Sequence, residues 1–173
     1  MPETVQSERV EERSALTGRS AKVDAVGTAL FVVTLAIAMP LREERGAQIA
    51  IGAVSMLLFA MGAGAALWAY VGALERSRTE EIGVANLYLL TGTGAPRPVK
   101  RMMSLLLAIQ VVLAFTGAII GATGLRGSQV NALAFGILVP MFGIGMNGLW
   151  SVRHGTFGPR INKSAQPSNR KIG

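Results

Sequence analysis

The sequence predicts an all-α fold: an integral membrane four-helix bundle made of two antiparallel transmembrane hairpins. The first observation is four long stretches without Asp, Glu, Lys, Arg or His, at residues 25–41, 47–74, 102–125 and 130–152. The second is that clusters of Lys and Arg separate these stretches. A helix needs about 20 mostly apolar residues to cross a hydrocarbon core roughly 30 Å thick. Three stretches reach that length, and the first does so only if Val23 and Asp24 lie at the headgroup edge.

The first hairpin follows a polar tail. Residues 1–23 are rich in Glu, Arg and Ser, which predicts a flexible cytoplasmic tail. Asp24 stands where the first span begins, so its carboxylate is expected to cap free N–H groups there, with an ion-binding role as the alternative. Pro40 ends the span, and residues 41–46 form a short outer turn.

The first span has a second interpretation. The segment Ala36-Ile37-Ala38 has the small-x-small form of a signal-peptide cleavage site. The preceding region is long and carries acids as well as bases, and Pro40 follows closely. We therefore expect the span to be retained, whereas cleavage would leave three spans and move the N-terminus out of the cytoplasm.

Residues 75–101 form the only sizeable loop. An apolar run at 82–90 is too short to cross a bilayer and follows a loose N-cap signature, which predicts a short interfacial helix. The glycines in the following TGTGAPRP segment lack the spacing of a phosphate-binding loop. The second hairpin follows, and Pro140 is expected to kink its last span. Residues 24–152 thus form the membrane domain, and 153–173 a basic cytoplasmic tail.

The distribution of positive charge predicts the orientation. Of the 17 Lys and Arg residues, 14 lie in residues 1–23, 75–101 and 153–173, and three lie in the two turns on the other side. Because positive charge accumulates in cytoplasmic segments, both termini are predicted to be cytoplasmic in a multi-pass protein of the cell (plasma) membrane. The same positions explain the net charge of +7, so we expect anionic lipid headgroups rather than nucleic acid as the partner.

Composition excludes several kinds of chemistry. The chain has no Cys, which removes disulfides, thiolate nucleophiles and iron–sulfur ligation. Its single histidine, His154, cannot ligate a haem within the bundle or form a metal site by itself. We therefore expect no cofactor, no metal and no catalytic residue, and an intramembrane enzyme is the least favoured class.

Small and polar residues are the remaining features of the spans. Helix backbones approach closely at small residues, which serve either packing within one bundle or docking of another membrane protein or a second copy. The candidate positions are Gly62, Ala66, Gly117, Gly121 and Gly143. Gln110 and Asn147 lie at similar depths and are predicted to form a hydrogen bond worth about 1 kcal/mol, with a substrate-contacting role as the alternative.

Aromatic and basic residues are predicted to anchor the inner ends of the spans. Trp and Tyr favour the membrane interface, and basic side chains bind anionic headgroups. The predicted anchors are Trp68, Tyr70, Trp150, Arg153, His154 and Arg160. Arg153, His154 and Arg160 form a basic and aromatic cluster with Phe157 and Pro159, and the alternative interpretation of this cluster is a docking epitope for a partner protein.

The exit from the last span carries a resemblance. The RHGTFGPR segment after a Gly-rich span, in an Ala- and Gly-rich chain, resembles small uncharacterised four-span integral membrane proteins of high-GC Gram-positive bacteria. That class has no established activity, so the resemblance implies no catalytic residues. Small multidrug transporters also have four spans but use an acidic residue in the first helix, and residues 25–41 contain none.

These observations favour a non-enzymatic role as a small subunit, assembly factor or scaffold of a larger membrane complex. The spans as delimited lack the ionisable residues that mark ion pathways, and they offer glycine faces for close contact. The alternative is an oligomeric small transporter or flippase-like carrier. It would use a weakly polar path lined by Gln110, Asn147, Ser55 and the threonines of the spans.

Overall fold

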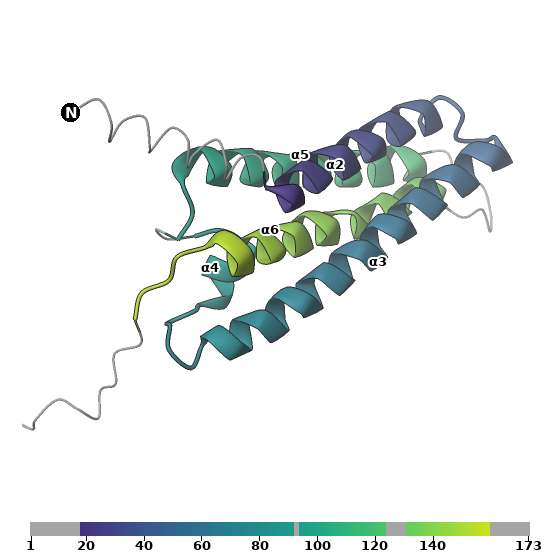
Figure 1. The fold of residues 1–173 in the computed structure, drawn as a ribbon. Coiled ribbons are helices and arrows are strands. Elements are labelled where there is room, and N and C mark those ends of the chain that lie inside the picture. Colours follow the sequence, from purple (N-terminus) through teal and green to yellow (C-terminus); the bar gives the residue numbers. More distant parts are fainter. Residues whose placement is uncertain (1–17, 92–93, 124–130, 160–173) are drawn as a thin grey trace, which may run out of the picture.

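The computed structural model describes residues 18–91, 94–123 and 131–159. Every named element in this part of the chain is helical (Figure 1). In order they are α2 (Arg19–Ala38), α3 (Arg45–Arg76), α4 (Val84–Tyr88), α5 (Arg97–Ala122), the 3₁₀ helix η1 (Ala132–Leu138) and α6 (Pro140–His154). The tail segments 1–17 and 160–173, with Arg160, and the RGSQ turn lie outside the described residues.

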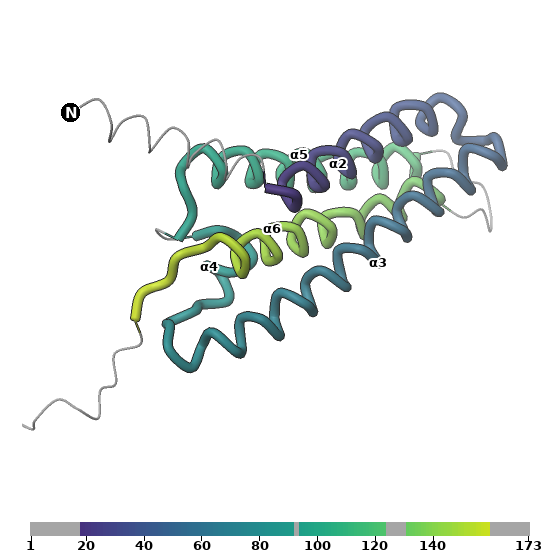
Figure 2. The backbone as a smooth tube through the Cα atoms, viewed as in Figure 1, coloured from purple at the N-terminus to yellow at the C-terminus, as the bar shows by residue number. Residues whose placement is uncertain are grey.

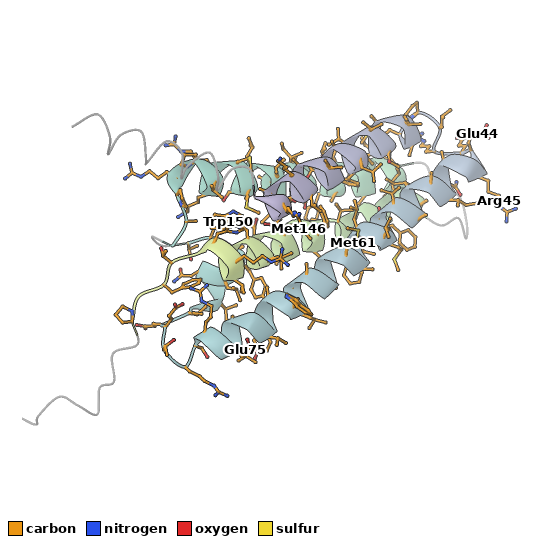
Figure 3. The ribbon with its side chains drawn as sticks, viewed as in Figure 1. Glu44, Arg45, Met61, Glu75, Met146 and Trp150 are labelled. Atoms are coloured by element: carbon orange, nitrogen blue, oxygen red, sulfur yellow. The ribbon has the colours of Figure 1, made fainter. Side chains whose placement is uncertain are left out.

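Four segments are long and apolar enough to cross a membrane, which confirms the prediction of an all-helical, multi-pass type of chain. They contain 20, 32, 26 and 23 residues, the last being η1 and α6 together. They run alongside one another in an elongated bundle, as the tube view shows (Figure 2). Glu44 and Arg45 lie at one end of α3 and Glu75 at the other, so charged residues flank the apolar middle of this helix (Figure 3).

The first span begins earlier than the uncharged stretch indicates. Helix α2 starts at Arg19 after the N-cap residue Gly18, and no side chain caps it. Asp24 therefore lies within the second turn of the helix, so the expectation that it caps the helix start is wrong. The arrangement follows from helix geometry: Arg19 and Lys22 project outward while Asp24 takes the inward face.

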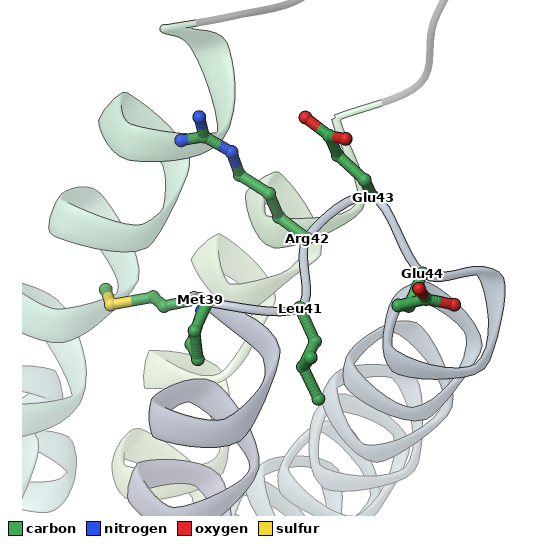
Figure 4. A pocket seen from close by; sticks show the side chains of 6 residues that line it. Met39, Leu41, Arg42, Glu43 and Glu44 are labelled. Atoms are coloured by element: carbon green, nitrogen blue, oxygen red, sulfur yellow. The ribbon is translucent and has the colours of Figure 1, made fainter.

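The turn between α2 and α3 is compact. Glu44 N–H donates to Leu41 O at 2.9 Å, and the Gln48 side chain donates to Arg42 O at 2.8 Å. A shallow hollow of about 510 Å³ opens here, lined by residues 39–44 (Figure 4). Its lining comes from one turn alone and contains none of the buried polar residues of the bundle, so we assign it no function.

The fourth span is two helices rather than one kinked helix. Asn131 caps η1, accepting from Ala134 N–H at 3.2 Å and donating to Ala118 O of α5 at 2.9 Å. Pro140 then occupies the first turn of α6, where its missing N–H leaves no intrahelical bond unmade. Phe142 N–H bonds three residues back to Val139 O, so the 3₁₀ pattern continues into the start of α6.

Glycines let α3 and α6 pack backbone to backbone. A Cβ atom on Gly62 would meet the Phe142 backbone, and one on Gly145 would meet Gly62 O. Ten residues further along α3, a Cβ on Gly72 would lie 2.7 Å from Val152 Cγ1. The two helices therefore stay in close contact over about three turns of α3, because a glycine on one helix leaves room for the backbone or side chain of the other.

Helix α4 is the short helix predicted in this loop, and its position at the membrane surface stays a prediction. It has five residues and packs between the ends of α3 and α6. Leu87 and Leu90 are buried, and the Tyr88 hydroxyl donates to Ala66 O of α3 at 2.9 Å. Val84 and Leu89 are exposed. These contacts attach the loop to the bundle.

Candidate functional site

A carboxylate is buried inside the bundle. Asp24 on α2 has an exposed fraction of 0%, and Thr28, one turn further along the same face, has 3%. Gln110 reaches them from α5: its Nε2 donates to Asp24 Oδ1 at 3.1 Å and to Thr28 Oγ1 at 2.7 Å. We call Asp24, Thr28 and Gln110 the polar centre. An ionisable group inside a membrane bundle is costly and usually marks a functional site.

Gln110 also supports the start of α6. Its Oε1 accepts a hydrogen bond from Gly143 N–H at 3.1 Å. This N–H lies close to the start of α6, and the absence of a side chain on Gly143 allows the Gln110 amide to approach it. A Cβ there would lie 2.6 Å from Gln110 Oε1. One amide thus connects three helices, α2, α5 and α6.

Two buried oxygen atoms beside this centre have no hydrogen-bond partner. They are Asp24 Oδ2 and the hydroxyl oxygen of Ser20, which has an exposed fraction of 4%. Ser20 lies one turn before Asp24, and helical side chains lean toward the helix start, so both oxygens belong to the same inner face. The face continues past Thr28 into the apolar Phe31 and Leu35. The buried polar side chains of α2, Ser20, Asp24 and Thr28, thus form a polar stripe near the beginning of the helix.

Gln110 and Asn147 do not form the predicted pair. Asn147 is buried on α6, but its Nδ2 donates to Tyr88 O at 3.1 Å and its Oδ1 has no partner. The prediction was wrong because depth alone does not set direction. Gln110 faces α2 and the beginning of α6, whereas Asn147, one turn beyond Gly143, faces α4. The sequence signal that was missed is the i, i+4 spacing of Ser20, Asp24 and Thr28.

The threonine path of the carrier hypothesis is shorter than expected. Thr34 and Thr116 hydrogen-bond to carbonyls of their own helices, Leu30 O and Val112 O, each at 2.8 Å on exposed faces. Ser55 is fully buried on α3 without a hydrogen-bond partner. Thr28 is therefore the only threonine of this set in the polar centre.

The candidate small residues pack inside the bundle. Gly62, Ala66, Gly117 and Gly143 are buried. A Cβ on Gly117 would lie 3.0 Å from Leu35 Cδ1, and one on Gly121 would overlap the Asn131 side chain. These positions serve contacts within the chain, and open space is found instead at Gly64, on the outer side of α3.

The predicted anchors divide into exposed and buried residues. Trp68 is 70% exposed and Tyr70 49%, as expected for side chains that face lipid or the interface. Trp150 is only 1% exposed and stacks on the His154 ring, with centroids 5.5 Å apart, so its prediction as an interfacial anchor is wrong. His154 and Arg153 are exposed at the end of α6.

Arg76 joins the end of α3 to the exit from α6. Its guanidinium donates to Val152 O at 2.8 Å and Gly155 O at 3.1 Å, and it pairs with Glu80 at 2.8 Å. It also lies 5.1 Å from the centroid of the Phe157 ring, a cation–π contact. In the sequence Arg76 is only one of the charges that flank a span, because its partners at the exit from α6 lie 76 to 81 positions away.

No group of three or more His, Cys, Asp or Glu side chains with metal-binding geometry occurs within the described ranges. The polar centre is thus the main chemical feature of the bundle. Its position also removes the reason for setting small multidrug transporters aside, since the first span does contain an acid.

The fold and centre define a class: a small all-α chain with four helical segments of membrane-spanning length and, among the described residues, one buried carboxylate. No family model, curated protein or solved structure matches the chain. The resemblance of the RHGTFGPR exit to small uncharacterised four-span integral membrane proteins of high-GC Gram-positive bacteria therefore stays a prediction.

Proposed function

We propose that the chain crosses the cell membrane four times as two antiparallel hairpins, with both termini in the cytoplasm. The support is the excess of Lys and Arg in residues 1–23, 75–101 and 153–173. The short turn between α2 and α3 suits a hairpin. Retention of the first span is supported by Phe31 and Leu35, which fill the core from α2.

The absence of native Cys makes this topology directly testable. Single cysteines at Glu43, in the α2–α3 turn, and at Arg78, after α3, are labelled with a membrane-impermeant maleimide in intact cells. We expect the Glu43→Cys variant to label from outside and the Arg78→Cys variant only after the membrane is opened. The reverse pattern would invert the topology, and equal labelling would rule out a single orientation.

Within this topology the protein acts as a non-enzymatic carrier of a small cation, with the polar centre as its binding site. The observation that carries this proposal is Asp24, a fully buried carboxylate with one unpartnered oxygen inside an apolar bundle. A scaffold gains nothing from this group, because desolvating a carboxylate costs several kcal/mol. The two sequence observations that favoured a scaffold are also weakened. The first span contains an acid, and the glycine faces make contacts within the chain.

Charge displacement in reconstituted vesicles tests carriage. Purified protein in lipid vesicles on a solid-supported membrane is exposed to jumps in H⁺, Na⁺ or K⁺ concentration. We expect a displacement with at least one cation that is lost in Asp24→Asn and kept in Ser55→Ala, which alters a buried oxygen outside the polar centre. A signal that Asp24→Asn retains, or no signal with any of the three, would contradict the carrier.

The subunit role remains the second candidate, and one observation favours it. Ala60 and Gly64 form a small-xxx-small pair on the exposed side of α3, with open space over Gly64. Mild-detergent purification from native membranes would then yield a second protein at fixed stoichiometry. Gly64→Leu should release that protein, while Gly52→Leu, at another open position of the same helix, should not. A particle containing only this chain would count against the subunit role.

A further inference from the structure

The orientation of the Gln110 amide decides what the polar centre can bind. Gly143 N–H is a backbone group that can only donate, so the Gln110 atom facing it at 3.1 Å must be the oxygen. The NH₂ group consequently faces α2, where its two hydrogens go to Asp24 Oδ1 and Thr28 Oγ1. Gln110 therefore presents N–H donors, and no oxygen, to a ligand at Asp24.

A metal ion is poorly matched to this arrangement. Ca²⁺ takes about 6 to 8 oxygen ligands and Mg²⁺ requires near-octahedral coordination. In the described part of the chain, the unpartnered buried oxygens of the polar stripe are Asp24 Oδ2 and Ser20 Oγ. One carboxylate oxygen, one hydroxyl and a pair of N–H groups do not form a coordination shell for a hard cation.

No cationic side chain is bonded to the carboxylate either. The one ion pair found among the described residues is Arg76–Glu80, at the far end of α3. The titratable groups on the elements packed around Asp24 lie near helix ends or on exposed helix faces. They are Arg19 and Lys22 on α2, Arg45, Tyr70, Glu75 and Arg76 on α3, Tyr88 on α4, Arg97, Lys100 and Arg101 on α5, and Arg153 and His154 on α6. A charged Asp24 would thus lack a counter-ion, and neutralising it removes the cost of burying the charge.

We propose that Asp24 is a proton-binding site, with the proton held on Oδ2, which has no hydrogen-bond partner among the described residues. Binding forms one O–H bond, neutralises the carboxylate and needs no other reactant. Ser20, the second residue of α2, places a further buried hydroxyl between this site and the end of the helix, where Arg19 is exposed. The inference rests on the proposed carrier function, because it names the species that the site would carry.

The chain offers a direct way to observe this proton, since Asp24 is its only aspartate. Protein labelled with ¹³C at the aspartate γ-carbon and reconstituted in lipid vesicles gives one carboxyl signal in solid-state NMR, assigned by its loss in Asp24→Asn. We expect the signal of a neutral carboxylic acid at about pH 6, where an exposed aspartate, with a pKa of about 3.9, is ionised. An ionised signal at that pH would overturn the proposal.

A further measurement separates a proton from other ligands. Raising Na⁺, K⁺ or Ca²⁺ at constant pH should leave the signal unchanged. A shift with any of them would overturn the proposal in favour of a metal ion.

The NMR titration and the vesicle measurement fail independently. A neutral Asp24 without charge displacement would retain the proton site and reject the carrier. Displacement driven by Na⁺ with an ionised Asp24 would retain the carrier and reject the proton site. Each proposal therefore has a result that contradicts it alone.

Discussion

Gln110 on α5 donates a hydrogen bond to Asp24 on α2 at 3.1 Å, across 86 positions of the sequence. Because the same amide also accepts from Gly143 N–H, the carboxylate, the third span and the beginning of the last helix form one connected unit. The bond thus joins the stability of the bundle to the chemistry of its buried acid, and both can be measured.

Gln110→Leu should destabilise the bundle by about 2–4 kcal/mol. The substitution keeps the approximate volume but removes the partners of Asp24 Oδ1, Thr28 Oγ1 and Gly143 N–H, and each buried group left unpaired costs about 1–3 kcal/mol. Denaturant unfolding in micelles measures the loss. Gln48→Leu is the control, since its single bond to Arg42 O is exposed and its loss should cost less than about 1 kcal/mol. Equal effects of the two substitutions would contradict the role given to Gln110.

A double-mutant cycle of Gln110→Leu and Asn147→Leu should be nearly additive. The two side chains do not bond to each other, and Asn147 bonds to Tyr88 O instead. Sites without shared partners add to within about 0.3–0.5 kcal/mol in unfolding free energy. A larger coupling energy would restore the direct pair that the sequence predicted.

Gly62→Ala and Gly64→Ala should have opposite outcomes although they lie two residues apart. A methyl group on Gly62 would collide with the Phe142 backbone, an overpacking that costs about 1–3 kcal/mol. Gly64 has open space, so alanine there should be neutral or slightly stabilising through its better helix propensity. Thermal unfolding of both variants in one detergent tests this, and similar midpoints would contradict the α3–α6 packing.

Arg76→Gln should loosen the exit from α6. It removes the guanidinium contacts with Val152 O, Gly155 O and the Phe157 ring. Loss of about 1.4 kcal/mol corresponds to tenfold faster exchange, so the Thr156 amide, bonded to Gly94 O, should exchange about tenfold faster or more. Hydrogen–deuterium exchange measures this. Arg78→Gln, at an exposed site two residues on, should leave the rate unchanged.

Tyr88 predicts a pH dependence outside the spans. Burial, with a smaller contribution from nearby Tyr70, raises the pKa of the Tyr88 hydroxyl above its ordinary value of 10.0. Because the folded state favours the protonated phenol that donates to Ala66 O, this stability is complete below about pH 10 and is lost as pH rises through the raised pKa. Tyr88→Phe should remove that dependence and cost about 1 kcal/mol at neutral pH. The free energy of unfolding, measured from about pH 8 to about pH 11, tests this. A parallel fall in the wild type and in Tyr88→Phe would contradict it.

Much of the bundle could be predicted from sequence because membrane spans are set by composition over about 20 residues. That criterion located four apolar helices but misplaced the beginning of the first, since it excluded any charged residue. Arg19 and Lys22 lie on the outer face of α2, while Asp24 is buried on the inner face, so the helix begins before the uncharged stretch. The direction of a side chain around a helix, rather than its charge, decided whether it belonged to the span.

The contacts of the candidate residues could not be predicted in the same way. Trp150 is of a residue type that commonly anchors spans at the interface, but it is buried in the core. Gly62 matches a docking pattern, but it contacts α6. In each case the residue type permits both roles. Only the position of a neighbouring helix distinguishes them.

The sequence by itself determined the class of structure: apolar length requires helices that satisfy their own backbone hydrogen bonds, and flanking charge indicates how they lie in a membrane. The tertiary structure decided which polar groups meet. Gln110 reaches Asp24 rather than Asn147 because the register between α5, α2 and α6 turns its amide that way. Register depends on close packing between residues distant in the chain, and the pattern along any single helix does not contain it.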